Sequence, residues 1–236
     1  MILRSLVAAL LVAAPAAAAT KAPVRPAAAK VDWTTTYAAT ADGGFVRGNP
    51  VARIKLIEYG SLTCPHCRAF HEAAMKTLLG TYVASGNLSY EYRSFVLNGP
   101  DYGAALVARC SGNPRTFFSA LNSFYLDQSV WTKPFADMSD ADIQRIQALP
   151  EGQRVAALAV AGKLDVYAAK LGMSRPRFDA CVADKTQVDK LLAMRKSAVE
   201  TSKITGTPGF LINGVYQADV FDWAKLEPLL QAAMKP

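Results

Sequence analysis

The stretch Glu58-Tyr59-Gly60-Ser61-Leu62-Thr63-Cys64-Pro65-His66-Cys67-Arg68-Ala69-Phe70 lies where a strand-forming pattern gives way to a helical one. The strand-forming run Ile54 to Tyr59 leads into it, and apolar residues at helical spacing follow Cys67. Cys64 falls at or near the predicted helix N-cap. Pro65 falls at the first helical position, where the missing N–H of proline costs nothing. We therefore expect both cysteines to lie at the amino end of a helix.

The amino end of a helix favours a thiolate over a thiol, because its unpaired N–H groups and the helix dipole stabilise negative charge. Cys64 and Cys67 are three residues apart, so they can reach each other as a small-ring disulfide. If Cys64 is stable as a thiolate, reduction of that disulfide is favourable and the disulfide is an oxidant. The motif thus predicts redox chemistry, for which no cofactor is expected.

Two other interpretations of the motif stay open at this point. Cys64, Cys67 and His71 could hold zinc or copper, although a closed zinc site takes four ligands and the other cysteines lie far away along the chain. A purely structural disulfide is the second alternative. A bridge that closes so short a loop, however, adds little stability through chain entropy.

The first 19 residues have the pattern of a secretory signal peptide. Arg4 precedes an apolar run from Leu6 to Ala14, and Ala17-Ala18-Ala19 is a small-x-small cleavage signature. We expect cleavage after Ala19 and a periplasmic protein without stable membrane insertion afterwards; an uncleaved anchor is the alternative. Outside the reducing cytosol, a Cys-x-x-Cys pair is expected to donate oxidising equivalents.

The charges of the chain do not predict a nucleic-acid partner. The formal net charge of +7 is moderate, and basic residues alternate with acids, as in Asp184-Lys185 and Asp189-Lys190. Such interleaving is typical of a solvated surface rather than of a basic patch.

Along the chain, the pattern predicts two sheet-forming parts with helices between them. Residues 20–43 are expected to form a flexible leader, which ends near the turn Asp42-Gly43-Gly44. Residues 44–100 have the pattern of a short edge strand at Phe45-Val46 followed by a β-α-β unit. This unit has a buried strand, a helix that ends at Gly80, and a strand of alternating residues from Leu88 to Val96.

The pattern from residue 101 to residue 183 is helical only. Asn113-Pro114 and Ser139-x-x-Asp142 mark two helix starts, and Gly172 marks a helix end. Residues 184–236 return to a sheet-forming part, in which Asn213-Gly214 between apolar runs is a strong type I′ hairpin signal.

Three features therefore coincide: an exported Cys-Pro-His-Cys, an all-helical insertion, and Thr207-Pro208-Gly209 before a hairpin. Together they resemble the DsbA family of thiol-disulfide oxidoreductases, over nearly all of the mature chain from about Gly44 to Met234. The resemblance implies an α/β protein with a thioredoxin fold and an inserted all-helical domain.

The resemblance also implies roles for individual residues. Cys64 would be the exposed nucleophile and Cys67 its more buried partner, with His66 helping to stabilise the Cys64 thiolate. Pro208 would be cis, and the backbone of Thr207 would pair with a bound substrate strand.

Glu58, six residues before Cys64, matches the buried acid of the family and would assist proton transfer at Cys67. A solvent-facing carboxylate at the strand end is the alternative. Some family members carry a second disulfide in the helical block, and Cys110 and Cys181 would form it here. Two separate buried thiols are the alternative for these residues.

The function that this resemblance implies is a periplasmic oxidase, which introduces disulfide bonds into exported proteins that have free thiols. A membrane quinone-coupled partner would reoxidise it. A disulfide isomerase or reductase is the second hypothesis, and a metal carrier that uses Cys64, Cys67 and His71 is the third.

Overall fold

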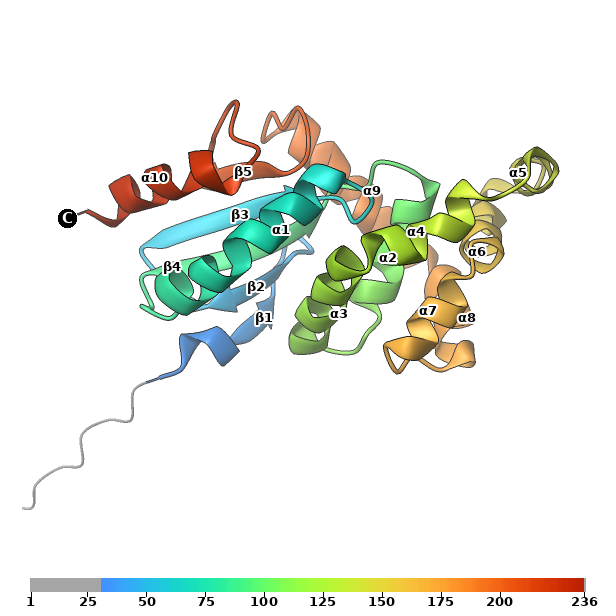
Figure 1. The fold of residues 1–236 in the computed structure, drawn as a ribbon, viewed down its shortest axis with the longest axis horizontal. Coiled ribbons are helices and arrows are strands. Elements are labelled where there is room, and N and C mark those ends of the chain that lie inside the picture. The colour runs from blue at the N-terminus through green and yellow to red at the C-terminus, as the bar shows by residue number, and fades with distance from the viewer. Residues whose placement is uncertain (1–30, 236) are drawn as a thin grey trace, which may run out of the picture. The chain divides into compact units, whose positions relative to one another are not determined.

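A computed structural model describes residues 31–235, and its strands form one mixed sheet (Figure 1). Within the described residues the strand order is β1-β2-β4-β3-β5-β6. Only the β3–β4 pair is parallel; the other neighbouring pairs are antiparallel. The strands are β1 (Tyr37–Ala39), β2 (Phe45–Gly48), β3 (Ile54–Gly60), β4 (Leu88–Ser94), β5 (Gly209–Ile212) and β6 (Val215–Tyr216).

The parallel pair is joined by a helical crossover, as the sequence predicts. α1 (Pro65–Thr77) follows β3 and continues into a π-helical segment, η2 (Leu78–Val83), before β4 begins. Strand residues alternate between the two faces of the sheet. Leu56 and Phe210 join the core cluster that includes residues of α1, whereas Tyr59 and Leu211 pack in a second cluster with Ala198.

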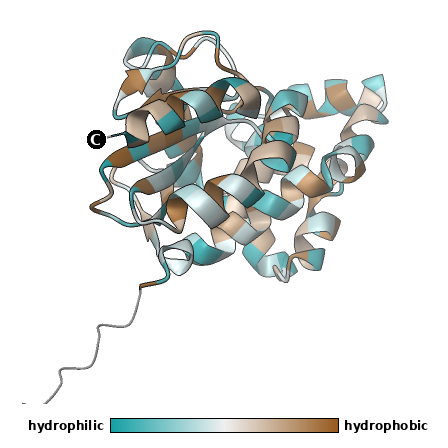
Figure 2. Cartoon of the chain, turned by 60° about the vertical axis from the view of Figure 1, so that its left-hand side comes forward, coloured by the Kyte–Doolittle hydropathy of each residue, from teal (hydrophilic) through white to brown (hydrophobic). Residues whose placement is uncertain are grey.

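A continuous run of helices separates β4 from β5, and Figure 1 shows most of it gathered at one end of the sheet. The helices are α2 (Gly99–Arg109), α3 (Pro114–Leu126), α4 (Gln128–Ala136), α5 (Asp140–Gln147), α6 (Glu151–Ala161), α7 (Leu164–Lys170), α8 (Arg175–Val182) and α9 (Lys185–Glu200). α10 (Trp223–Met234) follows the hairpin. In Figure 2 both hydrophilic and hydrophobic residues occur along the helices. An α/β thioredoxin fold with a helical insertion is thus confirmed.

Most of the predicted turns and caps are present. Asn113 accepts a hydrogen bond from the Thr116 N–H in a capping box, and Ser139 accepts one from the Asp142 N–H. Asn213 and Gly214 both have positive φ, of 50° and 83°, as a type I′ hairpin turn requires. These signals act within a few residues, so distant contacts do not alter them.

Two local predictions are wrong. Gly80 does not end the first helix; the π-helical segment passes through it, because this turn lets Tyr82 and Val83 become buried. Phe45 and Val46 do not lie at the sheet edge, since β1 pairs outside β2 and Tyr37 packs on Phe118 at a ring distance of 5.8 Å.

Residues 32–43, assigned from the sequence to the flexible leader, contain a short 3-10 helix, η1 (Trp33–Thr35), and β1. The predicted signal peptide and its cleavage after Ala19 lie outside the described residues. No helix between residues 31 and 235 has the length and apolar character needed to cross a membrane.

Cys110 and Cys181 form a disulfide, as expected, and join the end of α2 to α8 across 71 residues of sequence. In the chain-entropy model, a loop of this length contributes about 4 kcal/mol to stability. Replacing both cysteines by alanine should therefore lower the melting temperature by roughly 10 °C.

The same double variant should retain a turnover rate close to that of the unmodified protein, since neither sulfur belongs to the Cys-Pro-His-Cys motif. Calorimetry and a thiol-oxidation assay on one preparation test both statements. Two further titratable thiols in the denatured, non-reduced wild-type protein would contradict the bridge.

Candidate functional site

Cys64 occupies the N-cap of α1 and Pro65 its first turn, as the sequence predicts. The short loop from Ser61 to Thr63 carries the chain from the end of β3 to this cap. Both cysteines of the motif are free thiols in this structure. The Cys64 sulfur thus lies at the positive end of the helix dipole, next to backbone donors that the helix itself does not use.

The environment of Cys64 strongly favours its thiolate. The hydrogen bond from the Cys67 side chain lowers the pKa of Cys64 from 9.0 to about 5. A hydrogen bond from the Thr207 side chain and the backbone N–H groups of Cys67 and His66 lower this pKa as well, whereas burial raises it. Cys64 is therefore ionised at neutral pH in the reduced protein.

Cys67 has the opposite character. Its side chain has no solvent exposure, and burial raises its pKa well above 9.0. The hydrogen bond to Cys64 and the Glu58 carboxylate raise this pKa further. One sulfur of the pair is therefore stable as an anion and the other as a neutral thiol, which is the polarity that directional thiol-disulfide exchange requires.

The expectation that Cys64 is an exposed nucleophile needs correction. Its side chain is only 6% exposed, because it packs against the loop before β5 and its thiol donates to the Thr207 carbonyl at 3.3 Å. It is nevertheless the more accessible sulfur of the pair. The His66 side chain is exposed, and the hydrogen bond that His66 provides to Cys64 comes from its backbone N–H.

The Thr207–Pro208 peptide bond is cis, which confirms the prediction for Pro208. This peptide lies directly beside the redox pair, since the Thr207 carbonyl accepts the Cys64 hydrogen bond. The role of Thr207 and Pro208 in holding a substrate strand stays a prediction.

Glu58 is fully buried on β3, so the alternative of a solvent-facing carboxylate is excluded. Its Oε2 accepts a 2.6 Å hydrogen bond from the Tyr90 hydroxyl and lies 3.3 Å from His71 Nε2. Its Oε1 accepts no hydrogen bond from any residue between 31 and 235. His71 faces this carboxylate, and within residues 31–235 no three Cys, His, Asp or Glu side chains form a group that could hold a metal ion. The ligand set of the metal-carrier hypothesis is thus not assembled in this structure.

Asp101 and Gln128 hold the loop before Cys64, and neither residue was predicted to belong to the site. Buried Asp101 accepts hydrogen bonds from Ser61 Oγ at 2.6 Å and from the N–H groups of Leu62 and Leu97, both at 2.9 Å. Burial raises its pKa to about 6. Gln128 Nε2 donates to the carbonyls of Leu62 at 2.7 Å and Cys64 at 3.0 Å. No sequence pattern near Asp101 indicated these contacts, and α4, which carries Gln128, was not predicted as a separate helix.

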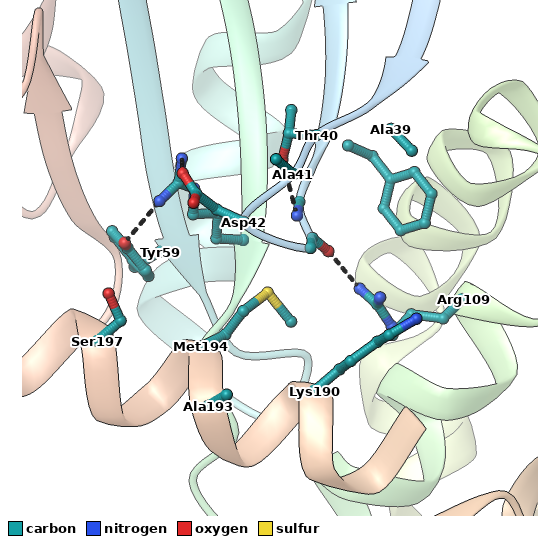
Figure 3. A pocket seen from close by; sticks show the side chains of 14 residues that line it. Ala39, Thr40, Ala41, Asp42, Tyr59, Arg109, Lys190, Ala193, Met194 and Ser197 are labelled. Carbon is teal, nitrogen blue, oxygen red and sulfur yellow. Dashed lines mark hydrogen bonds and ion pairs between the residues drawn. The ribbon is translucent and has the colours of Figure 1, made fainter. Parts of the chain in front are cut away.

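A cavity of about 430 Å³ lies between the β1–β2 turn and α9 (Figure 3). Three of the charged groups that line it, Asp42, Arg93 and Arg109, have partners within the protein. Arg93 pairs with Glu91 and Asp42 at 2.8 Å each, and Arg109 donates to the Gly43 carbonyl at 2.7 Å. These contacts tie the turn to the sheet and to α2, and none of the redox residues lines this cavity.

The comparison with known families and proteins agrees with this geometry. A family model described as Thioredoxin matches residues 40–232. A putative protein-disulfide oxidoreductase of Rickettsia typhi is 27% identical over 170 residues, which cover 72% of this chain and 54% of that protein. A putative protein-disulfide oxidoreductase of Rickettsia conorii is 27% identical over 174 residues, which cover 74% of this chain and 54% of that protein. The chain therefore spans about half the length of these curated relatives.

Solved structures show the same fold. A protein-disulfide isomerase from Novosphingobium aromaticivorans superposes with a TM-score of 0.78 at 32% identity, over 83% of this chain and 100% of that one. Alpha-DsbA1 of Wolbachia pipientis superposes with a TM-score of 0.63 at 23% identity. The match covers 80% of this chain and 89% of that one, which shows a shared fold.

Fold and site together define a protein of the thioredoxin-fold class, with a polarised cysteine pair at a helix start. The chain belongs to the thioredoxin family, and a helical region is inserted between two parts of its sheet. The resemblance inferred from the sequence is thus confirmed.

Proposed function

We propose that this protein is a periplasmic oxidase, which introduces disulfide bonds into exported proteins that carry free thiols. The polarity of the cysteine pair is the observation that carries the proposal. A Cys64 pKa of about 5 makes its thiolate a good leaving group and stabilises the reduced form. An active-site disulfide that is easily reduced passes its oxidising equivalents to the substrate.

The proposed reaction has two exchange steps. A substrate thiolate attacks Cys64 Sγ, the Cys64–Cys67 bond breaks, and the electron pair leaves with the Cys67 sulfur, which takes up a proton. A second substrate thiolate then attacks the substrate sulfur of the mixed disulfide, and Cys64 leaves as a thiolate. The reduced enzyme is reoxidised by a membrane quinone-coupled partner.

A disulfide isomerase is the second candidate, because the Novosphingobium protein of 32% identity bears that name. One experiment separates the two functions: the equilibrium of the active-site pair with glutathione, measured on the full exported chain, together with its mass in solution. We expect a strongly oxidising monomer. An oligomer that rearranges scrambled disulfides faster than it oxidises reduced substrates would favour the isomerase.

The location is tested separately. The protein should be recovered from the periplasmic fraction of a Gram-negative host, with an amino terminus at Thr20 if cleavage occurs after Ala19. Recovery with the cytosolic fraction would contradict the proposal, because a reducing compartment would keep the pair reduced.

Glu58→Gln should slow the step in which Cys67 gains or loses its proton, by about tenfold or more. The carboxylate raises the Cys67 pKa and is therefore electrostatically coupled to this thiol. The measurement is the pH profile of the single-turnover rate with a dithiol substrate, while substrate affinity should stay unchanged.

Glu91→Gln is the matched control, since it changes a buried carboxylate on β4 that pairs with Arg93 rather than with the redox site. A Glu58→Gln profile that coincides with the Glu91→Gln profile would remove Glu58 from the mechanism.

A further inference from the structure

The proton of Cys67 has no direct route to water. Cys67 and Glu58 are both 0% exposed, so neither side chain contacts the solvent directly. Each catalytic cycle nevertheless changes the protonation of Cys67 twice, once on reduction and once on reoxidation. A third group has to connect Glu58 with water.

His71 lies next to Glu58 on the side away from its free oxygen. The residue is on α1, one helical turn after Cys67, and its Nε2 lies 3.3 Å from Glu58 Oε2. The Tyr90 hydroxyl donates to the same carboxylate oxygen at 2.6 Å and lies 3.4 Å from His71 Nε2. Glu58 Oε2 therefore faces His71 and Tyr90, while Oε1 has no hydrogen-bond partner among the described residues. The charge of Glu58 acts on Cys67, whose pKa it raises.

His71 also reaches a cavity of about 300 Å³. Residues of β2, β4, α1, η2 and α3 line this cavity, with Arg47, Arg115, Ser119 and Asn122 among its polar groups. The cavity is large enough to hold water, and these side chains can hydrogen-bond to it. His71 is thus a buried group, 7% exposed, that touches both Glu58 and this cavity.

None of the other neighbours of the imidazole is a base that can bind an additional proton and hold it. The ring of Tyr125 of α3 lies against the imidazole at a centroid distance of 4.1 Å and a tilt of 34°, and Tyr92 of β4 approaches edge-on at 6.2 Å. Burial raises the pKa of Tyr90, Tyr92 and Tyr125 well above 10.0, so these hydroxyls stay protonated. The two arginines of the cavity stay cationic at every relevant pH.

We propose that His71 relays protons between the water of this cavity and Glu58, and that Glu58 passes them to and from Cys67. The inference rests on the proposed function, which makes Cys67 alternate between disulfide and thiol. On reduction, the proton moves from water to His71, then to Glu58, and finally to the Cys67 sulfur that has received the electron pair. On reoxidation, the proton leaves by the same path before Cys67 attacks.

The test measures reduction of the active-site disulfide by dithiothreitol in single-turnover experiments between pH 5 and 9. His71→Gln, which keeps a polar side chain of similar size, should slow the proton-dependent step by about tenfold and alter its pH profile. Met75→Ala opens the same cavity without touching Glu58, so it should react at the wild-type rate.

His71→Ala provides a second measurement, the rescue of the rate by an added base. A purely structural role of His71 would not give this rescue. Imidazole should enter the opened cavity and restore at least a third of the lost rate. Pyrazole, which has the same shape but is a far weaker base, should restore none. Rescue by both compounds, or a His71→Gln profile identical to the wild type, would overturn the proposal.

The dithiothreitol reaction needs no protein substrate, so it separates this inference from the proposed function. A wild-type protein that exchanges with dithiothreitol but does not oxidise exported proteins would contradict the oxidase alone. A His71→Gln variant with wild-type exchange kinetics would contradict the relay alone.

Discussion

Replacing Cys67 by serine should trap covalent complexes between the protein and its substrates, while replacing Cys64 by serine should abolish thiol oxidation. Cys64, with a pKa of about 5 and the greater exposure of the pair, is the sulfur that forms the mixed disulfide. Without the Cys67 thiol, no active-site sulfur can attack the mixed disulfide at Cys64, so the substrate is not released by re-formation of the Cys64–Cys67 bond. We expect the Cys64→Ser rate to fall at least about a thousandfold.

Non-reducing gels and mass spectrometry of the variants, isolated from an exporting host, provide the measurement. The Cys110–Cys181 bridge is present in both variants, so differences between them report on the redox pair alone. Complexes trapped through Cys67 in the Cys64→Ser variant would reverse the assignment of the two sulfurs. An equal yield of complexes in both variants would contradict the polarity described above.

The reduced protein should be more stable than the oxidised protein at pH 8, although the oxidised form contains one more cross-link. The pKa of Cys64 is about 5 in the folded state against 9.0 ordinarily. A depressed thiol pKa stabilises the folded state fully above the ordinary value, and this stability is lost as the pH falls through the folded value.

The two opposing contributions are similar in size. At pH 8 the thiolate contributes roughly 3 kcal/mol, after allowance for screening by water. The Cys64–Cys67 bridge closes a loop of four residues and contributes about 2 kcal/mol in the chain-entropy model. The raised pKa of Cys67 affects stability only above pH 9. We therefore expect the reduced form to melt about 2 to 4 °C higher at pH 8.

At pH 4.5 the oxidised form should have the higher melting temperature, because the thiolate contribution is lost there and the short bridge still constrains the unfolded chain. Thermal melts of both redox forms at the two pH values test this, with Cys110–Cys181 kept oxidised in each sample. An oxidised form that melts higher at pH 8 would contradict the thiolate argument and, with it, the main reason to propose an oxidase.

The sequence by itself determined the features that depend on neighbouring residues. Cys64 lies at the start of α1 because Pro65 and the apolar spacing after it define a helix there. Asn213-Gly214 forms its hairpin turn because these residues tolerate positive φ. The caps at Asn113 and Ser139 follow from hydrogen bonds that span three residues. The resemblance then supplied the cis bond before Pro208 and the bridge between Cys110 and Cys181.

Only the tertiary structure decided which groups surround the redox pair. Asp101 and Gln128 reach the loop before Cys64 from about 40 and 66 residues away, and no local pattern encodes such a contact. The 6% exposure of Cys64 depends on the loop at Thr207, 143 residues along the chain. His71 was a candidate metal ligand by spacing, but α1 packs on the sheet so that it faces Glu58 and Tyr90. Burial, and with it the contrast between the two cysteine pKa values, is a property of the packed molecule, because it requires elements distant in sequence to exclude water together.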